Sequence, residues 1–270
     1  MKRIGGVLLS LTLALGIFAG CGSTSGKSDA KSDTIKVGVT AGPHEEIIQK
    51  VKEVAKKQGL DVEYTSFNDY VQPNTQLNEK QIDVNIFQHE PYLKQFNKDH
   101  NMNLVKVANA VTFPMGVYSS KIKSLDKLKE GDKISLPNDP TNEARALALL
   151  EKGKVIKLKS GVGLKATKKD IVQNPKKIQF LELEAPMVPR SLNDVAVAVI
   201  NTNYAIEAKL DPNKDAIFKE PKDSPWVNII AARQDNKNAE NVKKLIKIYQ
   251  SDEVKKFINE HFKGSVIAVF

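Results

Sequence analysis

Alternation of strand and helix is the feature that most constrains how this chain of 270 residues can fold. From Thr34, apolar residues stand at every second position, which predicts a strand with one buried face. Pro43 then opens a segment with apolar residues at helical spacing, and Gly59 ends it. A second predicted strand covers residues 60–67. Strand, helix and strand in this order are typical of parallel strands in an α/β sheet.

The same alternation continues to the end of the chain and predicts an α/β fold throughout. About 250 residues follow position 20, enough for one large domain or two lobes. Asp139 followed by Pro140 predicts a capped helix start. Further strands are predicted at residues 84–87, 104–111, 115–118, 134–136, 178–183, 196–200 and 227–231. Further helices are predicted at residues 91–100, 124–128, 239–250 and 252–262.

The only cysteine, Cys21, follows a segment that resembles an export signal. Lys2 and Arg3 precede an uncharged apolar run at residues 4–18, and two small residues stand directly before Cys21. This arrangement is similar to bacterial lipoprotein signals, which are cut before a cysteine that carries diacylglycerol and acyl chains such as palmitate. We therefore predict a signal peptide at residues 1–20 and lipidation of Cys21.

An uncleaved membrane-spanning helix is the alternative for this segment. The apolar run has about 15 residues, fewer than the ~20 that cross a bilayer. Residues 22–33 are mostly Ser, Gly, Lys and Asp, so residues 21–33 are predicted to be a flexible, lipid-anchored tether. No later apolar stretch reaches spanning length. We expect the protein at the extracytoplasmic face of the cell membrane.

Charge and composition exclude several classes of function. The net charge of +9 becomes +7 once residues 1–20 are removed. Lysines alternate with apolar or small residues, as at 152–159 and 165–169, which is typical of a solvated surface. Without a recognition motif, this charge does not indicate a nucleic-acid partner. The absence of a second cysteine excludes a disulfide framework.

The sequence offers no pattern for metal binding or catalysis. Histidines stand at positions 44, 89, 100 and 261, and none has the spacing of a metal site. Nucleophile elbows and phosphate-binding glycine loops are absent as well. We expect no metal, no cofactor and no enzymatic activity.

Ring side chains gather where a predicted strand ends and a helix begins, at residues 83–93. Phe87, His89 and Tyr92 stand there, and Tyr70 adds a fourth ring from an earlier turn. Strand ends are where α/β proteins place ligand contacts. The alternative is that the aromatic rings belong to the core and His89 lies on the surface at the helix start.

This region also resembles a known family. The string Asn-Ile-Phe-Gln-His-Glu-Pro-Tyr-Leu at 85–93 is similar to the signature of methionine-binding lipoproteins, the NlpA family of solute receptors for ABC importers. The resemblance implies a two-lobed periplasmic-binding-protein fold of type II with a ligand cleft between the lobes. Lobe 1 would be residues 34–114 plus 229–270, and lobe 2 residues 115–228. Similar blocks follow in order at 137–142, 145–147, 189–192, 199–205, 224–228 and 263–267.

The resemblance implies eight ligand-binding residues, whose chemistry suits a free amino acid. Arg145 would hold the carboxylate with two parallel hydrogen bonds, although an arginine is more often a surface residue. Asn201 and Asn228 would offer oxygens to the ammonium, although asparagines are often turn or cap residues. Aromatic rings would form a slot for a thioether. The eight are Tyr70, Phe87, His89, Tyr92, Asn142, Arg145, Asn201 and Asn228.

The resemblance implies that a monomeric receptor captures L-methionine and delivers it to an ABC permease driven by its ATPase. The membrane would be reached through the lipid on Cys21. Other ligands remain open: D-methionine, a methionine-containing dipeptide or another apolar amino acid. An exported enzyme and an adhesin are more remote alternatives.

Overall fold

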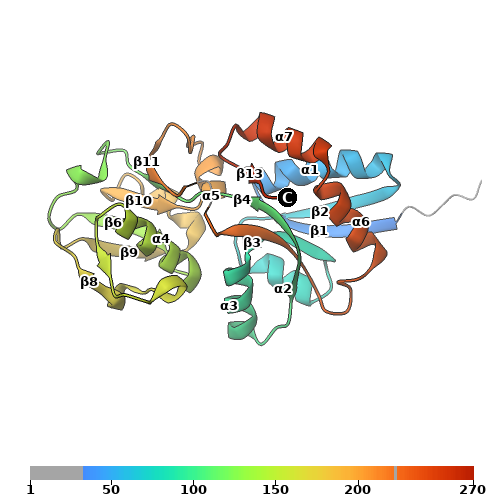
Figure 1. Ribbon diagram of the computed structural model, residues 1–270, viewed down its shortest axis with the longest axis horizontal. Coiled ribbons are helices and arrows are strands. Elements are labelled where there is room, and N and C mark those ends of the chain that lie inside the picture. The colour runs from blue at the N-terminus through green and yellow to red at the C-terminus, as the bar shows by residue number, and fades with distance from the viewer. Residues whose placement is uncertain (1–32, 222–223) are drawn as a thin grey trace, which may run out of the picture. The chain divides into compact units, whose positions relative to one another are not determined.

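The computed structural model describes residues 33–221 and 224–270, shown in Figure 1. The predicted signal peptide, Cys21 and residues 21–32 of the predicted tether lie outside this part of the chain. The first strand begins at Asp33, one residue earlier than predicted.

The larger sheet has six strands, and its first part follows the predicted strand–helix–strand pattern. Its strands, in spatial order, are β13 (Ile267–Ala268), β4 (Val105–Thr112), β12 (Val227–Ala232), β3 (Val84–His89), β1 (Asp33–Thr40) and β2 (Leu60–Phe67). Strand β1 runs parallel to both β2 and β3, whereas β12 runs antiparallel to β3 and β4, so the sheet as a whole is mixed.

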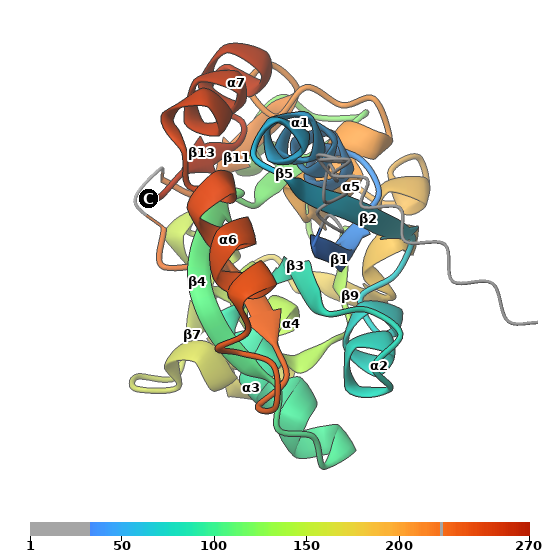
Figure 2. The ribbon, with the colours of Figure 1, turned by 90° about the vertical axis from the view of Figure 1, so that its right-hand side faces the viewer.

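Helices cover both faces of this sheet (Figures 1 and 2). The helices are α1 (Pro43–Lys57), α2 (Gln72–Asn78), α3 (Glu90–His100), α6 (Glu240–Tyr249) and α7 (Asp252–Phe262). Because successive strand residues point to opposite faces, Ile230 packs with α1, α6 and α7, while Ile229 and Ala231 pack with α2 and α3.

The second sheet has five strands and its own apolar core. Helix α4 (Pro140–Lys152) supplies several residues to that core, including Leu147 and Leu150, which are fully buried. Asp139 caps α4, as predicted, because its carboxylate accepts a hydrogen bond from the backbone N–H of Asn142 at 2.9 Å. The strands, in spatial order, are β11 (Ala216–Lys219), β5 (Gly116–Tyr118), β10 (Val197–Ile200), β6 (Lys133–Pro137) and β9 (Gln179–Leu183).

The chain crosses between the two sheets twice. It leaves the first sheet after β4 and enters the second at β5, and it returns between β11 and β12. The smaller elements are α5 (Thr202–Glu207), β7 (Lys157–Leu158) and β8 (Ile171–Gln173). Short 3₁₀ turns lie at Leu125–Lys127, Gly163–Lys165, Lys168–Asp170, Ala185–Met187 and Pro189–Ser191. Within residues 33–221 and 224–270, no helix is long and apolar enough to span a bilayer.

Candidate functional site

One pocket gathers all eight residues implied by the resemblance. It contains about 350 Å³ of space free of atoms, a volume that includes open solvent. Elements of both sheets contribute, because the pocket lies against the end of β3, the start of α4, the junction of β10 and α5, and β12. The remaining lining residues are Gln88, Phe113, Thr202 and Asn203.

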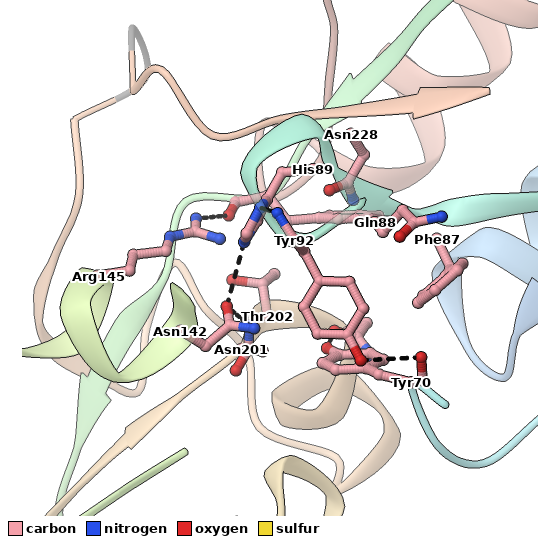
Figure 3. A pocket seen from close by; sticks show the side chains of 12 residues that line it. Tyr70, Phe87, Gln88, His89, Tyr92, Asn142, Arg145, Asn201, Thr202 and Asn228 are labelled. Atoms are coloured by element: carbon pink, nitrogen blue, oxygen red, sulfur yellow. Dashed lines mark hydrogen bonds between the residues drawn. The ribbon is translucent and has the colours of Figure 1, made fainter. Parts of the chain in front are cut away.

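Three aromatic rings form one wall of the pocket. The ring centroids of Tyr70, Phe87 and Tyr92 lie 5.8–6.0 Å from one another, so each ring contacts the other two. The Tyr92 hydroxyl donates to the backbone oxygen of Tyr70 at 3.0 Å, which fixes the turn that carries Tyr70 (Figure 3). An apolar slot with polarisable faces suits a thioether or an alkyl chain.

His89 is held as a neutral imidazole. Its Nδ1 accepts a hydrogen bond from the backbone N–H of Tyr92 at 3.1 Å and so caps α3. Nε2 therefore carries the proton and faces the Oδ1 of Asn142 at 3.4 Å (Figure 3). Burial, aided by the nearby charge of Arg145, lowers the pKa of His89 to about 3. The alternative interpretation, in which His89 lies on the surface at the helix start, is wrong, since His89 is only 4% exposed.

Asn142 organises the pocket from the start of α4. Its amide nitrogen donates to both carboxylate oxygens of Asp139, at 3.1 and 2.9 Å. Its oxygen accepts from the amide nitrogen of Asn201 at 2.8 Å and from His89. All polar atoms of the Asn142 side chain are thus engaged by protein groups.

Two buried amide atoms in the pocket have no hydrogen-bond partner among the described residues. They are the Oδ1 of Asn201 and the Nδ2 of Asn203. Burying an unpaired polar group costs about 1–3 kcal/mol, so such atoms call for an explanation. An unpaired acceptor and an unpaired donor on two residues that line one pocket are suited to bind a ligand that carries both kinds of group.

Arg145 is buried and held in a network with Glu220. Its Nε and Nη2 donate to the two carboxylate oxygens of Glu220 at 2.9 and 2.6 Å, and Nη2 also donates to the backbone oxygen of Phe113 at 2.7 Å. The guanidinium lies 5.3 Å from the ring centroid of Trp226. The two parallel bonds expected for a ligand carboxylate are therefore made with Glu220. Nη1 has no hydrogen-bond partner in residues 33–221 and 224–270.

Asn228 is linked to a second buried histidine. Its amide nitrogen donates to the Nε2 of His44 at 3.1 Å. Burial lowers the pKa of His44 to about 3, so this ring is also neutral. Phe113 packs edge-on against His44, with ring centroids 4.7 Å apart, and closes this side of the pocket.

Some residues in or beside the pocket were not predicted from the sequence, and only some of them lie in a recognisable motif. Gln88 and Asn203 stand inside the blocks at 85–93 and 199–205. Thr202 stands beside Asn203, and its hydroxyl donates to the backbone oxygen of Pro114. Glu220 belongs to no motif, and only the folded chain brings it to Arg145.

Sequence comparison finds close relatives over nearly the full chain. The D-methionine-binding lipoprotein MetQ of Salmonella typhimurium is 51% identical over 267 residues, covering 98% of this chain and 95% of the relative. The protein of the same name from Escherichia coli K12 is 49% identical over 267 residues, with the same coverage.

Solved structures of similar proteins lead to the same family as the sequence comparison. A nutrient-binding protein from Burkholderia cenocepacia, solved bound to methionine, superimposes with a TM-score of 0.85 at 52% identity, covering 87% of this chain and all of that one. The architecture is accordingly the periplasmic-binding-protein fold. The model of the family described as NlpA lipoprotein matches residues 35–270. With nearly the whole described part matched, this chain belongs to the NlpA lipoprotein family.

Proposed function

We propose that this protein is the extracytoplasmic receptor that captures methionine and delivers it to an ABC importer. The observation that carries the proposal is the composition of one pocket. Three rings form an apolar slot, and two atoms of other lining residues, Arg145 Nη1 and Asn201 Oδ1, have no hydrogen-bond partner among the described residues. Methionine has a matching set of groups, namely a thioether, a carboxylate and an ammonium. The names of the relatives from Salmonella typhimurium and Escherichia coli support this ligand.

Each ligand group would have a defined partner. The carboxylate would accept hydrogen bonds from Arg145 Nη1 and from the unpaired Nδ2 of Asn203. The ammonium would donate to the oxygens of Asn201 and Asn228. The thioether would lie among the rings of Tyr70, Phe87 and Tyr92, where sulfur–ring contacts stabilise by about 0.3–1.5 kcal/mol. His89 and Asn142 would hold this arrangement in place.

Capture would occur between two lobes, residues 34–114 plus 229–270 and residues 115–228. Contacts from both lobes favour the closed form, because a ligand shifts an equilibrium only by its differential affinity for the two forms. The closed monomer would dock on its permease, and no bond of the ligand would be made or broken. Lipid on Cys21 would keep the receptor at the membrane, since two acyl chains are enough for stable attachment.

The first test is calorimetric titration of the purified chain, freed of any ligand that co-purifies, with L-methionine, D-methionine and leucine. We expect a saturable heat with methionine and affinity for leucine lower by about tenfold or less, because leucine lacks only the sulfur contact. Preference between the two enantiomers identifies the physiological form. No heat and no thermal shift with any amino acid or short dipeptide would contradict the proposed function.

A second prediction concerns the contact of Tyr70 with Asn203, which joins the loop after β2 to α5. The Tyr70 hydroxyl donates to the Oδ1 of Asn203 at 2.6 Å. Tyr70→Phe keeps the ring and removes this bond, worth about 0.5–1.5 kcal/mol, so methionine affinity should fall up to about tenfold. Tyr64→Phe is the matched control, because that hydroxyl accepts from Gln49 on the outer surface of the first sheet. Equal affinities of the two variants would contradict a role for this bond in closure.

A further inference from the structure

The buried pair of Arg145 and Glu220 has an unusual place beside the pocket. Both side chains are nearly inaccessible, at 4% and 5% exposure. The Glu220 carboxylate is fully paired, because it accepts from Nε and Nη2 of Arg145 and from the backbone N–H of Met115 at 2.9 Å. A buried ion pair adds little net stability compared with apolar residues of similar size. Its presence therefore calls for a functional explanation.

This pair determines the charge balance of the pocket. His89, which lines the pocket, and His44, which is hydrogen-bonded to the lining residue Asn228, are neutral, since burial lowers the pKa of each to about 3. The phenols of Tyr70 and Tyr92 are neutral too, because burial raises their pKa values. Among the described residues that line the pocket, Arg145 is then the only charged side chain.

One further carboxylate, that of Asp139, stands behind Asn142. It does not line the pocket, and it accepts hydrogen bonds at the N-terminus of α4, where the helix dipole favours a negative charge. Glu220 is therefore the carboxylate that compensates Arg145. With the pair intact, Arg145 and Glu220 together bring no net charge to the pocket.

We propose that Glu220 sets the net charge of the ligand that the pocket accepts. With Glu220 in place, a ligand of zero net charge, a zwitterion, meets a balanced site. A monoanion or a monocation with the same side chain brings an uncompensated charge into a buried space, which is unfavourable. This inference rests on the proposed function, because it assumes that the ligand carboxylate faces Arg145.

Glu220 also positions the guanidinium. Because it engages Nε and Nη2, rotation of Arg145 about its last bonds is prevented and Nη1 is left toward the pocket (Figure 3). Replacement by the nearly isosteric glutamine removes the negative charge and leaves a pocket with a net positive charge. Such a pocket should favour an anionic ligand and disfavour a cationic one.

The test measures three ligands that share the thioether side chain, by calorimetry or competition: methionine, the deaminated anion (methylthio)butanoate, and the cation methioninol. In the wild type, methionine should bind at least tenfold more tightly than either analogue. In Glu220→Gln, the affinity for the anion relative to methionine should rise about tenfold, while methioninol should not gain. A general loss of structure would weaken all three ligands together, so the opposite behaviour of anion and cation is specific to charge.

Two variants separate charge from position. Glu220→Asp keeps the charge but is shorter, so overall affinity should fall while the ratio of anion to methionine stays at the wild-type value. Glu182→Gln is the matched control, because Glu182 is paired with Lys168 at 2.8 Å but lies on β9 outside the pocket. It should leave all three affinities unchanged.

The outcomes distinguish this inference from the proposed function. If the wild type binds methionine but the ratio in Glu220→Gln is unchanged, the role of Glu220 is wrong and the receptor function stands. If the wild type binds the anion as tightly as methionine, the charge selection is wrong, whether or not the variant folds. If the wild type binds none of the three ligands, the proposed function itself fails.

Discussion

Arg145→Ala is expected to reduce methionine affinity by about thirtyfold or more. Truncating one partner of a buried, charged hydrogen bond costs about 2–5 kcal/mol, and each 1.4 kcal/mol is a tenfold change in affinity. In this pocket the substitution removes Nη1, the guanidinium nitrogen left open for a ligand carboxylate. Calorimetric titration with methionine measures the loss. Unchanged affinity would mean that the carboxylate is held by other groups.

The same substitution should also destabilise the fold, because it leaves the Glu220 carboxylate buried without its cation. Breaking such a pair costs about 3–5 kcal/mol. Replacing both residues with methionine removes both charges, so the double variant should recover much of this stability and still not bind. Urea unfolding of the single and double variants separates the loss of stability from the loss of binding. A double variant as unstable as Arg145→Ala would contradict this account of the pair.

Arg233→Ala is the matched control for loss of a partly buried arginine. Arg233 donates to the backbone oxygens of Leu77 and Ile82, at 3.1 and 2.6 Å, and pairs with Asp235. It does not line the pocket. This variant should lose stability and keep the methionine affinity of the wild type.

A second large effect is expected from acid. The folded chain holds His44 and His89 neutral, with burial lowering the pKa of each to about 3, whereas an unfolded histidine titrates near 6.5. Between these values the unfolded chain binds more protons, so the free energy of unfolding falls as the pH is lowered from about 6.5 to about 3. Each histidine accounts for about 3–5 kcal/mol over this window, a large fraction of the 5–15 kcal/mol of a typical domain.

Urea unfolding at a series of pH values measures this effect. The slope of unfolding free energy against pH near pH 5 reports how many more protons the unfolded chain binds. His44→Gln and His89→Gln should each reduce that slope by about one proton, and the double variant should reduce it by about two. A slope that neither substitution changes would show that other groups cause the acid sensitivity.

Local chemistry explains why many elements were predictable from the sequence. Pro43 and Gly59 mark the ends of α1, and Asp139 with Pro140 marks the start of α4, because caps depend only on neighbouring residues. Helix α2 was missed. It has seven residues, and its buried Asn74 is stabilised by hydrogen bonds to Gln88 and Asn85, which are distant contacts that periodicity does not encode.

The site shows the same limit. The rings at 87, 89 and 92 could be found because they are neighbours in the sequence. The sequence also gives Arg145 as a cation that could bind a carboxylate, but it does not show that two of its nitrogens are already bound. That information depends on Glu220, which β11 brings to α4 only in the folded chain. The balance of charge in the pocket is therefore a property of tertiary structure.

The hydrogen bonds around Arg145 also join the two places where the chain crosses between the sheets. Phe113 and Met115 belong to the first crossing, and Glu220 stands at the start of the second. Arg145 donates hydrogen bonds to Phe113 and to Glu220, and the backbone N–H of Met115 donates directly to Glu220. A change in the angle between the two sheets at these crossings would distort the hydrogen bonds that orient the Arg145 guanidinium. The same few atoms therefore control both the rigidity of the connection between the sheets and the orientation of the guanidinium in the pocket.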